Sequence, residues 1–300
     1  MKVLIAGGSG LVGTALTGSL RGDGYTVSRM VRPGSQAAAG DVTWNPLSAL
    51  VNVPAMEGFD AVVNLSGASI AGGRWTSRRK QVLRGSRVDS TRVLVDALAH
   101  LKQPPRVFVC ASAIGFYGDR GDEVLTETSG HGNDFLAILC RAWEGEAARA
   151  AGSGVRTVIA RFGIVLSADG GALPRMLTPF RFGAGGRLGS GKQWMSWIAL
   201  EDAVRVLRAA MDNASWNGPV NVVAPEPVRN AEFTRVLASV LHRPAIFPAP
   251  ALALRLALGE MANALLLSSQ RVQPERLLQG GFPFRYENLE AALHAIVTKA

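Results

Sequence analysis

The sequence predicts an α/β protein: a doubly wound, parallel sheet of the Rossmann type, followed by a small, mainly helical C-terminal domain on the substrate side. Three observations predict this class. A glycine-rich turn follows the first apolar run, strand-like runs alternate with helical segments, and the composition becomes rich in Ala and Leu near residue 248. We therefore expect a first domain over residues 1–245, with interleaved substrate-binding segments, and a helical domain over residues 246–300.

The first element is the apolar run Val3–Ala6, which is typical of a strand buried on both faces. Glycines follow at positions 7, 10 and 13. Gly7 can form the tight turn, Gly10 lets the backbone approach a pyrophosphate, and Gly13 lets the next helix pack against the strand. Phosphates would then bind N–H groups at a helix N-terminus. A purely structural turn is the alternative. We predict a dinucleotide site that uses Gly7, Ser9, Gly10, Leu11 and Val12.

The second strand, expected over Tyr25–Val31, indicates which dinucleotide binds. NAD sites carry an Asp or Glu at the end of this strand, about 20 residues after the glycines. Here the strand ends in Arg29-Met30-Val31-Arg32, without a carboxylate. A guanidinium can hold a 2′-phosphate through paired, charge-assisted hydrogen bonds. We predict NADP(H) as the cofactor and Arg32 as the better candidate for the 2′-phosphate; a solvated arginine is the alternative.

Two further segments are expected to contribute cofactor contacts. The apolar run that begins at Ala61 ends in Asn64-Leu65-Ser66-Gly67, and ligands of open α/β sheets bind at the carboxyl ends of the strands. We predict that Leu65, Ser66 and Gly67 contact the cofactor. Asn64 either belongs to the same site or only fixes the local turn. Residues 75–100 have an apolar stripe at helical spacing. Arg87 within them is either a phosphate ligand or a surface arginine.

Composition favours a protein of a reducing compartment, and we expect it to be cytoplasmic. Cys110 and Cys140 are the two cysteines, both in apolar surroundings, so a disulfide framework is improbable. No charged and apolar leader precedes the first strand, which argues against a signal peptide. The apolar run Pro248–Leu267 is interrupted by Arg255 and Glu260, so we expect a helix here and no membrane partner.

The charge pattern favours a small-molecule partner. The net charge is +9, but the basic residues are scattered, apart from the cluster at positions 78–87. A positive cleft for nucleotides explains this charge as well as nucleic acid does, so we expect no nucleic-acid partner. The four histidines are isolated, and no metal site is expected. A homodimer is compatible with the sequence.

Several motifs resemble the extended short-chain dehydrogenase/reductase superfamily, and more closely its atypical "epimerase family protein" subgroup, which is NAD-dependent epimerase/dehydratase-like. Beside the glycine turn and residues 64–67, the motifs are residues 112–118, 161–166, 183–198, 258–261, 270–274 and 281–284. The match spans nearly the whole chain. The resemblance implies oxidoreductase or epimerase chemistry with a nicotinamide cofactor, places Val165 near the nicotinamide, and implies a small C-terminal domain.

The resemblance also exposes a departure from the usual catalytic residues. Extended members generally use a Tyr-x-x-x-Lys pair, which aligns with Leu136 and Cys140 when counted back from Glu144. Neither side chain can do the work of that pair. We hypothesise instead that Ser112 and Tyr117 contact the substrate oxygen as catalytic residues. The alternative is that Tyr117 packs the turn and Ser112 bonds to the backbone.

The second half of the chain is expected to bind the substrate. Residues 167–193 hold seven glycines, so we expect a mobile loop over the cleft, with Arg187 and Lys192 as candidates for an anionic substrate group. Asn230 is predicted to cap a helix that runs to His242.

The sequence thus predicts an NADP(H)-binding oxidoreductase or epimerase-like enzyme for an unidentified small molecule, with a sugar- or nucleotide-linked compound as one option. Because the Tyr/Lys pair is absent, a non-catalytic NADPH-sensing regulatory protein is the alternative. Pockets of this superfold diverge freely, so the substrate does not follow from the sequence.

Overall fold

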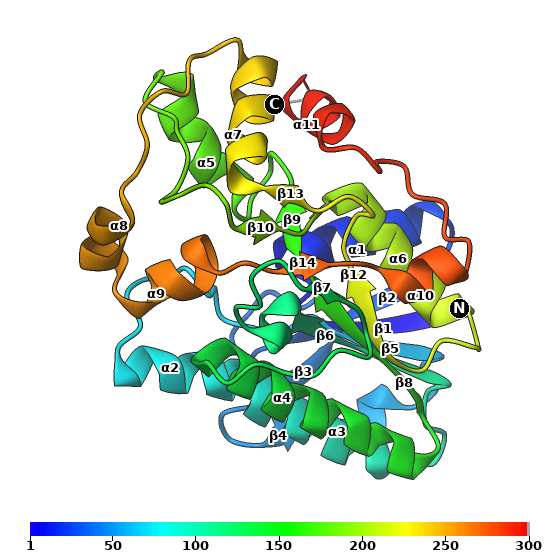
Figure 1. Ribbon diagram of the computed structural model, residues 1–300. Helices are drawn as coiled ribbons and strands as arrows, with labels where there is room; N and C mark the ends of the chain where they lie inside the picture. Colours follow the sequence, from blue (N-terminus) through cyan, green and yellow to red (C-terminus); the bar gives the residue numbers. More distant parts are fainter. Residues whose placement is uncertain (299–300) are drawn as a thin grey trace.

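The computed structural model describes residues 1–298 and is built on one eight-stranded sheet (Figure 1). The strand order is β12-β8-β6-β5-β1-β2-β3-β4. The strands are β1 Lys2–Ala6, β2 Thr26–Val31, β3 Val42–Asn45, β4 Leu50–Val51, β5 Ala61–Asn64, β6 Val107–Ala113, β8 Arg156–Phe162 and β12 Gly218–Val222. Neighbouring strands are parallel except for β3 with β4, which are antiparallel. The predicted doubly wound, Rossmann-type sheet is confirmed.

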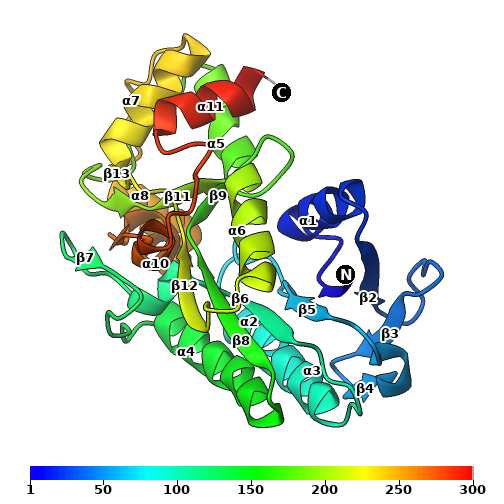
Figure 2. The same ribbon diagram turned by 90° about the vertical axis from the view of Figure 1, so that its right-hand side faces the viewer.

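Helices cover both faces of the sheet (Figure 2). Helices α1 (Leu11–Gly22) and α6 (Leu200–Asp212) share a core with one face of the central strands. Helices α3 (Ser90–Ala99) and α4 (Phe135–Ala148) share a second core with the other face. Because successive side chains of a strand point to opposite faces, an unbroken apolar strand such as β1 serves both cores.

A third core lies above the sheet in Figure 1 and is formed by the second half of the chain. It joins α5 (Leu173–Arg181), α7 (Asn230–Leu241) and α11 (Leu289–Thr298). Short strand pairs link this part to the sheet: β9 (Ile164–Leu166) with β11 (Trp197–Ala199), β10 (Trp194–Met195) with β13 (Val228–Arg229), and β7 (Val124–Leu125) with β14 (Arg271–Val272). Helix α10 (Glu275–Gln279) packs on the core of α1 and α6 through Leu277. Residues 251–298 are therefore divided among several cores: Met261 belongs to the core of α3 and α4, Leu277 to that of α1 and α6, and Leu293 to the third core.

Three local expectations differ from the structure. The segment 167–193 contains the regular helix α5, which begins after the Gly170-Gly171 pair. The expected helix over 248–267 is broken into α8 (Ala251–Leu258), α9 (Glu260–Ala262) and a π-helical turn, because Gly259 adopts a φ of +64°. The predicted Asn230 cap is wrong: Arg229 occupies the N-cap position, Asn230 is the first residue of α7, and its Oδ1 accepts the Leu188 N–H at 2.8 Å.

The segment over residues 75–100 is helical, as predicted, but it is not one continuous α-helix. It consists of α2 (Ser77–Arg84), a π-helical turn over Gly85–Asp89, and α3. Both cysteines are free and buried. Within residues 1–298, no helix has the length and apolar character needed to cross a bilayer.

Candidate functional site

The turn between β1 and α1 has no room for side chains. A Cβ atom on Gly7, whose φ is +79°, would lie 2.6 Å from the carbonyl carbon of Leu65. A Cβ atom on Gly13 would lie 2.3 Å from the Gly7 carbonyl oxygen. Gly10 occupies the N-cap position of α1 and offers no side-chain acceptor to the first N–H groups of the helix. The turn therefore has the close packing and the open helix N-terminus that a pyrophosphate site requires.

The segment after β5 lies directly against this turn. The Leu65 N–H donates to the Ala6 carbonyl at 2.8 Å. Asn64 is fully buried; its Oδ1 accepts the Ser66 N–H at 3.1 Å and its Nδ2 donates to the Thr91 hydroxyl at 2.8 Å. Asn64 thus fixes the turn, which was the alternative considered for it. Leu65, Ser66 and Gly67 are held beside the glycines at the carboxyl edge of the sheet.

Arg87, on the π-helical turn, packs against this segment. Its guanidinium carbon would be 3.1 Å from a Cβ on Gly67, and its Nη2 donates to the Ala68 carbonyl at 3.0 Å. Its other hydrogen bonds go to the Leu83 carbonyl and the Ser86 hydroxyl, which are also neutral. Burial lowers the pKa of Arg87 because it disfavours the charged form. A cation without a carboxylate partner is therefore held next to Gly67.

Val165 and the start of α1 meet on the other side of the turn. A Cβ on Gly171 would lie 3.2 Å from the Leu11 side chain and 3.6 Å from the Val165 carbonyl oxygen. Val12 and Val165 both pack against the core of α1 and α6. The structure thus brings nearly all of the predicted cofactor residues to one edge of the sheet, with Ser9 exposed in the turn.

The two arginines at the end of β2 have different surroundings. Arg29 is committed to Asp41: its Nη2 donates to Asp41 Oδ2 at 2.7 Å, and its backbone N–H donates to Oδ1 at 2.8 Å. The stem of Arg29 also lies under Gly8, since a Cβ there would be 3.2 Å from Arg29 Cγ. Arg32 follows β2 and is exposed. The contacts thus leave Arg32, rather than Arg29, available to an anion at this end of the site.

Ser112 belongs to a buried polar network at the carboxyl end of β6. Ser112 and Arg161 are opposite each other on the neighbouring strands β6 and β8. The Ser112 hydroxyl donates to Glu144 Oε1 at 2.6 Å. Arg161 donates to the same carboxylate twice, from Nε at 2.8 Å and from Nη2 at 2.7 Å. All three side chains are buried, so Ser112 is bonded to a side chain and not to the backbone.

Tyr117 joins this network from the other side and is fully buried. Its hydroxyl donates to Asn221 Oδ1 at 2.7 Å and accepts from Arg161 Nη1 at 3.0 Å. Burial raises the pKa of Tyr117, which keeps the phenol protonated at neutral pH. The backbone N–H of Asn221 donates to Glu127 Oε1 at 3.0 Å. The single proton of the Tyr117 hydroxyl is donated to Asn221, so this hydroxyl can donate to a substrate oxygen only after the bond to Asn221 breaks.

Sequence reasoning did not find Glu144, Asn221 and Glu127 as members of this network. A signal was present for the first, because Glu144 follows Leu136 and Cys140 on the buried face of α4. A carboxylate on a buried face needs a cationic partner, and Arg161 directly follows the apolar run Val158-Ile159-Ala160 of β8. Glu127, in the loop that follows Tyr117, is buried as well.

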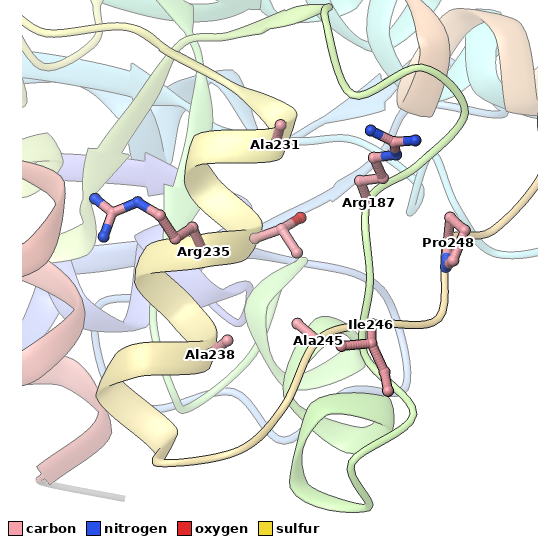
Figure 3. Close-up of a pocket in the computed structure, with 8 residues that line it drawn as sticks. Arg187, Ala231, Arg235, Ala238, Ala245, Ile246 and Pro248 are labelled. Carbon is pink, nitrogen blue, oxygen red and sulfur yellow. The ribbon is translucent and has the colours of Figure 1, made fainter.

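A separate cavity of about 460 Å³ lies beside α7 (Figure 3). Arg187, Ala231 and Pro248 contribute to its lining. Arg235 also lines it, but its guanidinium donates to Glu232 on the same helix. None of the lining residues comes from the strand ends that form the glycine-turn site, so this cavity is distinct from that site.

Comparison with known proteins identifies the family. The model of the "NAD dependent epimerase/dehydratase family" matches residues 3–223. The chain belongs to this family. A second model, "Domain of unknown function (DUF1731)", matches residues 249–296.

Several known proteins are similar to this chain over nearly its whole length. The epimerase family protein Mb2239 of Mycobacterium bovis is 44% identical over 99% of this chain and 98% of its own. The crystal structure of human epimerase family protein SDR39U1 (isoform 2) with NADPH has a TM-score of 0.92 at 34% identity, covering 100% of both chains. A nucleoside-diphosphate sugar epimerase structure from Corynebacterium glutamicum has a TM-score of 0.81 at 36% identity, covering 99% of this chain and 58% of that one.

In this chain, the side chains at the positions of the usual Tyr/Lys pair are apolar and closely packed. Leu136 and Cys140 are buried on α4 and face Gly115, where a Cβ would lie 3.2 Å from Leu136 Cβ and 3.9 Å from Cys140 Sγ. Burial raises the pKa of Cys140 to about 12, so its thiol stays protonated. Neither side chain can exchange a proton near neutral pH, and neither carries a positive charge.

Proposed function

We propose that this chain binds NADP(H) and acts as an epimerase-type oxidoreductase on a small molecule. The observation that carries the proposal is the closed glycine turn, in which Gly7 and Gly13 leave no space for a Cβ. The similarity to the human protein crystallised with NADPH supports the same cofactor. When bound, the nicotinamide would accept or donate a hydride.

The residues of the site divide the binding of such a cofactor between them. The N-terminus of α1 and the turn at Ser9 and Gly10 would hold the pyrophosphate. Arg32 would bind the 2′-phosphate, because it is exposed and follows β2 directly, whereas Arg29 is paired with Asp41. Arg87 would add a positive charge beside Gly67.

For the substrate side we propose that Ser112 contacts the substrate oxygen; because its only proton is donated to Glu144, its lone pairs would accept a hydrogen bond from a substrate hydroxyl. Its hydroxyl is held by Glu144, whose carboxylate is neutralised by Arg161, so the serine is fixed at the end of β6. Tyr117 is the second member of the original hypothesis. Because its hydroxyl donates to Asn221 and accepts from Arg161, its contribution to binding is to position Arg161 unless a bound substrate oxygen replaces Asn221.

A non-catalytic NADPH sensor is the second candidate, and one observation favours it. Leu136 and Cys140 replace the proton-transferring pair with apolar side chains. A protein that binds NADPH tightly, but oxidises it with no compound of a broad carbonyl and nucleotide-sugar screen, would be this sensor.

The first experiment is a titration with NADPH and NADH, followed by tryptophan fluorescence, in the parent protein and in Arg32→Glu. We expect a preference for NADPH that Arg32→Glu removes, because the carboxylate repels the 2′-phosphate. Arg106→Glu is the matched control, since Arg106 is exposed just before the amino end of β6. Equal affinity for both dinucleotides would exclude the assignment of Arg32. Failure to bind either would exclude the proposed function.

A further inference from the structure

Leu252 and Leu256 of α8 belong to none of the cores formed by residues 1–298, whereas Leu258 at the end of the helix packs against the core of α3 and α4. The helix has the sequence Ala-Leu-Ala-Leu-Arg-Leu-Ala-Leu, and none of its residues is buried. Leu252 and Leu256 are 68% and 70% exposed. They are four residues apart and therefore lie on the same side of the helix. An exposed apolar surface of this kind indicates contact with another molecule.

Three more exposed side chains extend this surface. Phe182 is 84% exposed, Ile246 71% and Phe247 61%. The segments that carry them run side by side, since the Phe247 N–H donates to the Gly185 carbonyl at 3.2 Å. Figure 1 shows the second segment passing from α7 to α8 along the edge of the molecule, and Figure 3 shows Ile246 on it. We name this surface the apolar ridge: Phe182, Ile246, Phe247, Leu252 and Leu256.

The charge around the apolar ridge has one sign. Residues 170–200 and 233–259, which supply the ridge, contain seven Lys and Arg and no Asp or Glu. Arg181, Arg243 and Arg255 are exposed. Glu260, the first acidic residue after these segments, is paired with Lys80 at 2.5 Å. The ridge is therefore an apolar surface with cations beside it, and the segments that supply it carry no carboxylate.

This combination determines which partner fits. A second copy of the chain, packed by twofold symmetry, would place cations against cations. An anionic bilayer surface instead offers hydrocarbon for the leucines and phenylalanines and phosphates for the arginines. We propose that the apolar ridge binds the surface of membranes that contain anionic phospholipid. The expectation of no membrane partner came from the absence of a spanning segment, whereas a helix that lies on the surface needs no such length.

Co-sedimentation with lipid vesicles tests the proposal on the full chain. We expect binding to vesicles of phosphatidylcholine with phosphatidylglycerol, little binding to phosphatidylcholine alone, and release by added salt. Leu252→Ser with Leu256→Ser should weaken binding by at least about tenfold, because two apolar side chains are removed from the contact. Arg243→Glu with Arg255→Glu should do the same through charge alone.

The matched control is Leu47→Ser with Leu50→Ser, which removes two exposed leucines from the β3–β4 hairpin. This control should keep vesicle binding, and NADPH affinity should be unchanged in every variant, since none of these residues belongs to the glycine-turn site. Absence of parent binding to anionic vesicles, or an equal loss in the control, would overturn the proposal. Light scattering tests whether the ridge instead binds a second copy of the chain. If the parent protein is a dimer that does not bind vesicles, and the Leu252 and Leu256 substitutions dissociate it, the ridge is a subunit interface and the membrane proposal is wrong.

Discussion

Arg161 and Glu144 form a buried ion pair with two parallel hydrogen bonds, at 2.8 and 2.7 Å. The same pair holds Ser112 through the carboxylate and Tyr117 through the guanidinium. The guanidinium also lies over the Phe116 ring, 3.6 Å from its centroid. The Arg161 guanidinium therefore has favourable partners around it, and the hydroxyls of Ser112 and Tyr117 are both positioned by the Arg161–Glu144 pair.

Removing one member of this pair should be costly. Arg161→Leu leaves the Glu144 carboxylate buried without a cation, which we expect to lower the free energy of unfolding by about 3–5 kcal/mol. Arg149→Leu is the matched control, because Arg149 pairs with Glu146 near the end of the same helix but is half exposed; its cost should stay below about 1 kcal/mol. Urea unfolding measures both. Equal costs would contradict the special role given to the buried pair.

The glycine turn makes an equally direct prediction. A Cβ on Gly13 meets the Gly7 carbonyl oxygen at 2.3 Å, so Gly13→Ala must move α1 away from β1. We expect a loss of about 1–3 kcal/mol in stability and NADPH binding weakened by at least about tenfold, or about 1.4 kcal/mol. Gly18→Ala on the same helix meets nothing within 4 Å and should stabilise the protein by about 0.5–1 kcal/mol. Unchanged NADPH affinity in Gly13→Ala would remove the turn from the binding site.

The parts of the fold that depend on local pattern could be predicted from the sequence. The run Val3–Ala6 and the glycines at 7, 10 and 13 are contiguous, and their apolar character and spacing already determine a buried strand, a turn and a helix start. Arg32 followed from the same reasoning, because its place at the end of β2 depends only on counting from the turn.

Features that depend on distant contacts could not be predicted in this way. Arg161 needs an anionic partner, but the sequence does not say that Glu144, rather than another carboxylate, lies across from it. Asn230 has the residue type of a helix cap, yet its side chain bonds to Leu188 because two segments meet there. The apolar run after Pro248 suggests burial, and only the packing of the chain shows that Leu252 and Leu256 are exposed.

The buried cysteines predict a change of stability in alkaline solution. Burial raises the pKa of both Cys110 and Cys140 to about 12, against about 8.5 in an unfolded chain. The contribution of the two thiols to the free energy of unfolding is constant below the pKa of the unfolded chain. It falls as the pH rises toward 12, because only the unfolded state loses the protons. The expected slope is at most about 1.4 kcal/mol per pH unit for each thiol. Urea unfolding at pH 8 and pH 10 should therefore show a smaller drop in Cys110→Ala with Cys140→Ala; an unchanged drop contradicts this account.

Ser112 and Tyr117 can be separated by kinetics once a substrate oxidises NADPH. Ser112→Ala should lower kcat by about 10²-fold or more, in the range of a lost proton-transfer or oxygen-binding group. Tyr117→Phe leaves Asn221 Oδ1 without its donor and should lower the free energy of unfolding by about 1–3 kcal/mol. A direct role for Tyr117 requires kcat to fall as well, whereas full turnover would limit Tyr117 to positioning Arg161. Tyr25→Phe, at a partly exposed tyrosine beside α1, is the control and should change neither quantity.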